Sequence, residues 1–122
     1  MFSDLSTKVA KKLVANMKVR KGRDIHYGRK IKEIEVDEYL LIQKFKEQKG
    51  LCHWSSLPLY EKYNLISKHP LAISVDRLNN DLGYSYENIV LVRRMFNLGR
   101  SSFPEDQYAE VVQILKEEIK NG

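Results

Sequence analysis

The chain has 122 residues, a formal net charge of +5, 43% hydrophobic residues and 30% charged residues. This length accommodates one domain with appendages and a single modest core. No apolar run is long enough to span a membrane, and the first residues lack the apolar core and cleavage site of a secretion signal, so we expect a cytoplasmic protein with no membrane partner. The only cysteine, Cys52, excludes an internal disulfide and a multi-cysteine zinc cluster.

Positive charge is concentrated near the N-terminus. Residues 1–32 contain ten lysines and arginines against two aspartates, whereas the other ninety residues contain eleven basic and fourteen acidic ones. This asymmetry favours a polyanion partner, and we expect DNA; a solvated tail that only aids solubility is the alternative. The residues expected to bind DNA are Lys18, Arg20, Lys21, Arg23, Arg29 and Lys30, together with Arg93 and Arg94 further along the chain.

Apolar spacing and turn residues predict an α+β fold. We divide the chain into a basic helix and linker at 1–35 and a second region with a C-terminal helix at 36–122. The predicted elements are a helix over 3–17, a linker over 19–32, a helix over 37–48 capped by Asp37, strands at 51–55 and 71–77, a turn at 79–84 with Gly83 at positive φ, a helix over 87–98, and a helix over 104–120. Two strands and one helix bury little alone, so the helices at 37–48 and 104–120 are expected to complete the core.

Two polar residues suggest a metal site in the middle third. Asp76 ends the second predicted strand, and Asn97 lies near the end of the helix that follows. A carboxylate and an amide oxygen are hard ligands of the kind that Mg²⁺ prefers, with water and a phosphate completing the coordination. Asn88 is nine residues before Asn97 and out of phase with it on a helix, so we expect Asn88 to clamp the 79–84 turn instead.

The same residues resemble a known family. Gly50-Leu51-Cys52-His53-Trp54-Ser55, Ser74-Val75-Asp76-Arg77-Leu78, Gly83-Tyr84, Glu87-Asn88 and Asn97 together are similar to phage and bacterial proteins of the HNH class, over roughly residues 36–100. The resemblance implies a small ββα-metal (His-Me) finger flanked by helices, with Mg²⁺ (or Mn²⁺) held by Asp76 and Asn97 and with Asn88 bracing the loop. It also implies a metal-dependent DNA endonuclease in a bacterial or phage-infected cell.

One position departs from the usual HNH pattern. Arg77 stands where a histidine usually serves as the general base, and arginine stays protonated and cannot take that role. It can bind phosphate or stabilise transition-state charge, and a subgroup resembling this chain also has arginine there. An ordinary surface or packing role is favoured for each of the three histidines, His26, His53 and His69. As a relocated base, His53 ranks ahead of His69 because strand pairing would hold its side chain, whereas His69 lies in a loop. The alternatives to an endonuclease are a catalytically inactive HNH-fold DNA-binding protein and, third, a helical partner-binding protein.

Overall fold

The structure, a computed structural model, describes residues 4–101 and 103–121. Within that part of the chain it combines helices with a two-stranded antiparallel sheet, so the expected α+β class is confirmed. The elements are α1 (Thr7–His26), α2 (Glu38–Glu47), the 3₁₀ turn η1 (Glu61–Leu65), β1 (Ile73–Arg77), the 3₁₀ turn η2 (Tyr86–Asn88), β2 (Ile89–Arg93), α3 (Arg94–Arg100) and α4 (Glu105–Asn121).

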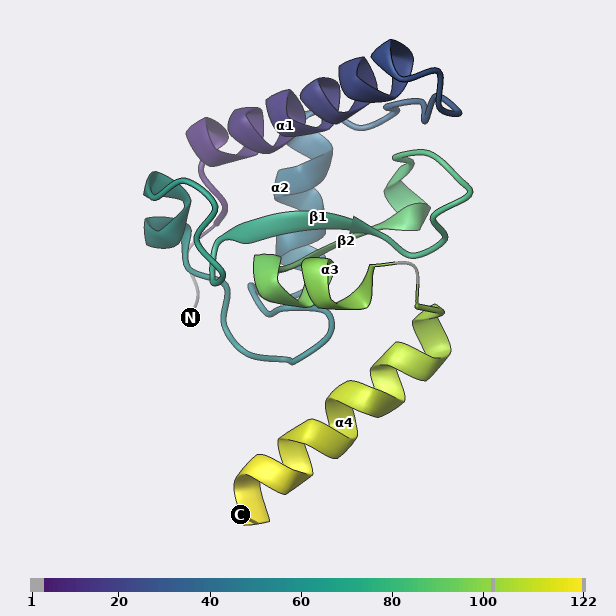
Figure 1. Ribbon diagram of the computed structural model, residues 1–122. Coiled ribbons are helices and arrows are strands. Elements are labelled where there is room, and N and C mark those ends of the chain that lie inside the picture. Colours follow the sequence, from purple (N-terminus) through teal and green to yellow (C-terminus); the bar gives the residue numbers. More distant parts are fainter. Residues whose placement is uncertain (1–3, 102, 122) are drawn as a thin grey trace.

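The hairpin and the short helix after it form the centre of the molecule. β1 and β2 pair so that Ile73 lies opposite Arg93 and Arg77 lies opposite Ile89. α3 begins directly after β2 and packs against both strands. In Figure 1, α1 lies above the hairpin, α2 behind it and α3 below it, while α4 extends away from the body. The resulting order is strand, loop, strand, helix.

One of the two strands is not where the sequence predicts it. The predicted strand at 51–55 is wrong, as is the helix over the first part of 87–98. Residues 51–59 form a tight turn instead, in which Cys52 N donates to Leu57 O (2.8 Å) and Ser56 adopts a φ of 60°. The run from Ile89 to Val92 is buried at every position, and three of its four residues are β-branched, which suits a strand covered on both faces.

A side chain satisfies the open edge of β2. Leu91 N donates to Oε1 of Gln48 (2.8 Å), and Nε2 of Gln48 donates to Leu91 O (2.8 Å) and to Leu51 O (2.8 Å). His53 N also donates to Leu91 O at 3.0 Å. The Gln48 amide therefore satisfies this edge of β2 in place of a further strand, because a buried backbone group needs a partner.

The basic N-terminal segment is part of the folded body. α1 starts with Ser6, whose hydroxyl accepts a hydrogen bond from Val9 N, and continues to His26. The linker prediction for 19–32 is therefore wrong over its first eight residues. The buried face of α1 joins the same core as Leu41 and Phe45 of α2 and as β2; it consists of Val9, Ala10, Leu13 and Met17. The basic residues of α1 thus belong to a wall of the molecule.

The remaining helices lie close to their predicted ranges. Asp37 caps α2 by accepting from Leu40 N (3.0 Å), and Lys49 and Gly50, both at positive φ, end it. α4 begins after Pro104 as predicted, but its anchorage is narrow, since Tyr108 and Val112 are its buried residues. On α2, Tyr39 and Leu40 have exposed fractions of 71% and 36%, and the buried apolar residues are Leu41 and Phe45.

Gly83 is required for a close approach and not for a left-handed turn. Its φ is not positive, so that prediction is wrong. A Cβ at this position would lie 2.6 Å from Glu33 O. The neighbouring backbone explains the crowding, because Tyr84 N donates to Glu33 O (2.7 Å) and Glu35 N donates to Tyr84 O (2.9 Å). The segment after α1 is thereby attached to the hairpin loop.

Candidate functional site

Asn88 holds the long hairpin loop closed. Its Oδ1 accepts from Asn79 N (2.9 Å), and its Nδ2 donates to Asn79 O (3.1 Å) and Gly83 O (2.8 Å). The side chain is buried. These are the contacts expected of a brace between the two ends of the 79–83 turn.

Asp76 lies in a buried polar network. Its Oδ2 accepts from Trp54 Nε1 (2.9 Å) and from Arg100 Nε (3.0 Å), and its Oδ1 accepts from Arg100 Nη2 (3.0 Å). The side chains of Asp76 and Arg100 are 4% and 2% exposed. The guanidinium therefore meets the nearly buried carboxylate with two parallel hydrogen bonds, a geometry specific to arginine.

Arg100 is the residue that sequence reasoning missed. Besides Asp76, it donates to Phe103 O (2.8 Å), to Asn80 Oδ1 (3.3 Å) and, by a short contact, to Arg77 O. It thus ties the end of α3 to β1 and to the hairpin loop. A signal was available, because Arg100 follows Asn97 by three residues and neighbours it on one helix face.

Asp76 and Asn97 come together at one cavity. Nδ2 of Asn97 donates to Ser74 Oγ (2.9 Å) and Val75 O (3.2 Å), which fixes the amide against β1. No donor to its Oδ1 is found among residues 4–101 and 103–121. A cavity of about 300 Å³ is lined by both predicted ligands and by two cations; its walls are Arg20, Asp76, Arg77, Asn80, Asn97, Leu98 and Ser101.

The donor set at this cavity fits a divalent ion in type, but its charge is partly neutralised. A carboxylate has about four acceptor positions, and three are used on Asp76, so Oδ1 keeps one. Asn97 Oδ1 is a second hard oxygen. Two protein oxygens with several waters suit Mg²⁺. Arg100 already balances the negative charge of Asp76, however, and no group of three or more His, Cys, Asp or Glu side chains suited to a metal occurs in the described part of the chain.

Arg77 reaches the cavity but also organises the loop. Its Nη1 donates to Asn80 O (3.3 Å) and Leu82 O (3.2 Å), and its guanidinium carbon lies 5.0 Å from the ring centre of Tyr84. These bonds leave other N–H groups of the guanidinium free of protein acceptors within the described residues. Arg77 is therefore positioned to meet an anion at the cavity.

The histidines do not line this cavity. His53 packs edge-on against Trp54, with ring centres 4.8 Å apart, outside the cavity wall. Partial burial lowers the pKa of His53, while the carboxylates of Glu105 and Asp76 oppose that shift. His69 is engaged locally, since its Nδ1 accepts from Leu71 N (3.0 Å) and its ring stacks on Tyr63.

The residues predicted to bind DNA separate into three sets. Some are occupied by protein partners: Lys21 pairs with Glu33 (3.2 Å), Arg29 with Asp24 (3.6 Å), and Arg93 donates to Pro58 O (2.9 Å). Lys18 and Lys30 are exposed on the surface.

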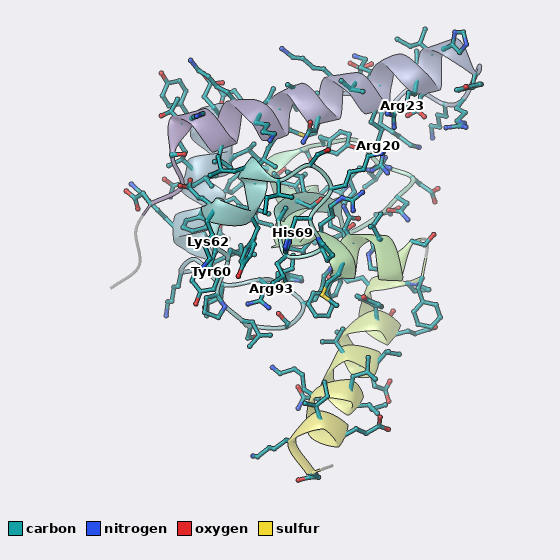
Figure 2. The ribbon with its side chains drawn as sticks, turned by 60° about the vertical axis from the view of Figure 1, so that its left-hand side comes forward. Arg20, Arg23, Tyr60, Lys62, His69 and Arg93 are labelled. Atoms are coloured by element: carbon teal, nitrogen blue, oxygen red, sulfur yellow. The ribbon has the colours of Figure 1, made fainter. Side chains whose placement is uncertain are left out.

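The third set gathers at one place, where Arg94 also donates to Lys68 O (3.0 Å). Arg20, Arg23 and Arg94 line a larger cavity of about 480 Å³ between α1, β1 and α3. Figure 2 shows Arg20 and Arg23 on the side of α1 that faces the body, apart from Arg93. Arg20 also lines the smaller cavity with Asp76, so this set adjoins the candidate metal ligands.

Comparison of the chain with models of known protein families, with curated proteins and with solved structures gave no match. In the described residues, no helix has the length and apolar character needed to cross a membrane. Any assignment of function therefore depends on the geometry of the site and on the residue pattern.

Proposed function

We propose that this chain is a metal-dependent DNA endonuclease of the HNH-like class, in which β1, β2 and α3 form the ββα finger. The observation that carries the proposal is that Asp76 from β1 and Asn97 from α3 line one cavity beside Arg20 and Arg77. An acidic residue and an amide from a strand end and a facing helix are the donors that such chemistry requires, and the cations supply contacts for a phosphate.

Asp76 Oδ1 and Asn97 Oδ1 are the atoms that would hold Mg²⁺ (or Mn²⁺). When bound, such an ion polarises a phosphoryl oxygen and lowers the pKa of a coordinated water. The protein contributes the placement of these atoms. Ser74 and Val75 orient the Asn97 amide, Trp54 and Arg100 orient the Asp76 carboxylate, and Arg77 lies where a guanidinium can stabilise charge on a phosphate.

The identity of the proton acceptor does not follow from the cavity walls. Arg77 is excluded because it stays protonated. His53 has a lowered pKa, which favours the neutral imidazole that can accept a proton, but its ring packs edge-on against Trp54 and does not line the cavity. We therefore assign no base.

A catalytically inactive DNA-binding protein on the same fold is the second candidate, and one observation favours it. The Asp76 carboxylate is already neutralised by a buried arginine, and this weakens its attraction for a divalent cation. In this alternative, Arg100 fills the role of a structural cation, and the finger only presents its basic surface to the DNA backbone.

A nicking assay on supercoiled plasmid separates the two candidates. The purified protein is incubated with Mg²⁺, with Mn²⁺ and with EDTA, and DNA binding is measured in parallel by fluorescence anisotropy. The endonuclease proposal requires nicking with either metal and none in EDTA. Binding without nicking under all three conditions, with cleavage appearing in the variant Arg77→His, would establish the inactive DNA-binding protein instead.

A further inference from the structure

The larger cavity is a groove with one sign of charge. Its walls come from α1, the segment after η1, β1 and α3, and they contain five cations and no carboxylate. The cations are Lys12, Arg20, Arg23, Lys68 and Arg94. A groove lined by a single charge sign concentrates the electric potential and selects a polyanion.

Apolar side chains share these walls with the cations. Val19, Leu65, Ile66 and Leu98 are 55%, 74%, 55% and 57% exposed, and all four line the groove. Binding of phosphates alone would not need these exposed apolar side chains. A single strand of DNA offers both kinds of group, since its phosphates seek cations and its unpaired bases offer broad faces to apolar side chains, which a double helix hides within its stack.

The groove leads into the candidate site. Arg20, Asn97 and Leu98 line both cavities, so the two are neighbours along α1 and α3. A strand lying in the groove would bring its next phosphate to the cavity that contains Asp76 and Arg77. Residues of α1 form one wall of this cavity, which has a volume of about 480 Å³.

We propose that this groove binds a single strand of DNA that runs into the site, so that the preferred substrate has unpaired nucleotides beside the scissile phosphate. This rests on the proposed function for the identity of the nucleic acid as a substrate. It assigns to α1, which lies outside the HNH-like region, the task of holding that strand. Arg20 and Arg23 are free for this, because their guanidinium groups make no hydrogen bond or ion pair within residues 4–101 and 103–121.

Binding of labelled oligonucleotides in EDTA tests the groove without any cleavage. Fluorescence anisotropy compares a 30-nucleotide single strand, the matching duplex and a duplex with one splayed end. The groove variant is Arg20→Ser/Arg23→Ser. The control is Lys11→Ser/Lys18→Ser, which removes the same charge from the opposite side of α1, at exposed positions that line neither cavity. Charge substitution is preferable to deletion of α1, since Val9, Ala10, Leu13 and Met17 belong to the core.

We expect the single strand and the splayed duplex to bind at least about tenfold more tightly than the full duplex. The groove variant should lose this preference, and its salt slope on the single strand should fall by about 1.4, which is two phosphate contacts at roughly 0.7 each. The control should keep the preference. Equal or tighter binding of the full duplex, or equal losses in both variants, would overturn the proposal. The binding assay contains no metal, so its result is independent of the nicking assay. A protein that does not nick plasmid DNA would refute only the endonuclease proposal. A protein that nicks DNA but shows no preference for a single strand would refute only the groove proposal.

Discussion

Replacement of Arg100 by methionine is the sharpest test of how the site is held together. The change removes both hydrogen bonds to Asp76 and those to Phe103 O, Asn80 Oδ1 and Arg77 O. It leaves a buried carboxylate with Trp54 Nε1 as its remaining donor. Loss of one partner of a buried ion pair costs about 3–5 kcal/mol, since the other charge stays desolvated.

The expected loss is a large fraction of the total free energy of unfolding. A chain of this length has a free energy of unfolding of roughly 6–18 kcal/mol. Urea unfolding followed by fluorescence of the single tryptophan, Trp54, and by far-ultraviolet circular dichroism measures the loss. Trp54 is a local reporter because it contacts Asp76 directly.

Two further variants give the test its controls. Arg93→Met removes an arginine from a more exposed position where it donates to Pro58 O, and should cost no more than about 1.5 kcal/mol. The double variant Asp76→Asn/Arg100→Met removes the orphaned charge while keeping an acceptor for Trp54, so it should be more stable than Arg100→Met alone. An Arg100→Met loss below about 1 kcal/mol, or a double variant less stable than the single one, would refute the reasoning.

Three other predictions concern the loop and the histidine. Gly83→Ala should destabilise the fold by about 1–3 kcal/mol in urea unfolding because its Cβ would lie 2.6 Å from Glu33 O, whereas Gly22→Ala in open space on α1 should be neutral or stabilising. Asn88→Ala should cost about 1–3 kcal/mol and speed hydrogen exchange of the 78–88 amides; unchanged exchange would contradict its role as a brace. Because the pKa of His53 is lowered in the folded state, the unfolded state binds more protons near the ordinary value of 6.5. The free energy of unfolding therefore falls as the pH drops through that value. His53→Asn should lose less of its free energy of unfolding between pH 7.5 and 5 than the wild type does. Equal losses for both proteins would rule that out.

The sequence was sufficient for features decided locally. Asp37 and the Lys49-Gly50 pair mark the ends of α2 through capping and positive φ, and the alternation before Asp76 marks β1. The exchange of strand and helix at 87–98 arose because a run of four apolar residues fits both periodicities. The β-branched side chains of Ile89, Val90 and Val92 were the available signal for a strand.

The parts of the fold and of the site that the sequence did not predict depend on tertiary contacts. The Gln48 side chain pairs with the backbone of Leu91 at the edge of β2, and no local sequence pattern indicates this contact. The pairing of Arg100 with Asp76 joins residues 24 apart through a helix whose start had been misplaced. The need for glycine at position 83 comes from Glu33, which belongs to a different segment.

The most direct test of the endonuclease assignment compares two asparagine variants on the same DNA. Single-turnover cleavage of a labelled substrate with Mg²⁺ is measured for wild type, for Asn97→Ala at the cavity and for Asn121→Ala at the exposed end of α4. The account predicts that Asn97→Ala lowers the cleavage rate at least about 100-fold with DNA binding unchanged, while Asn121→Ala cuts like wild type. Equal rates for Asn97→Ala and wild type would contradict it.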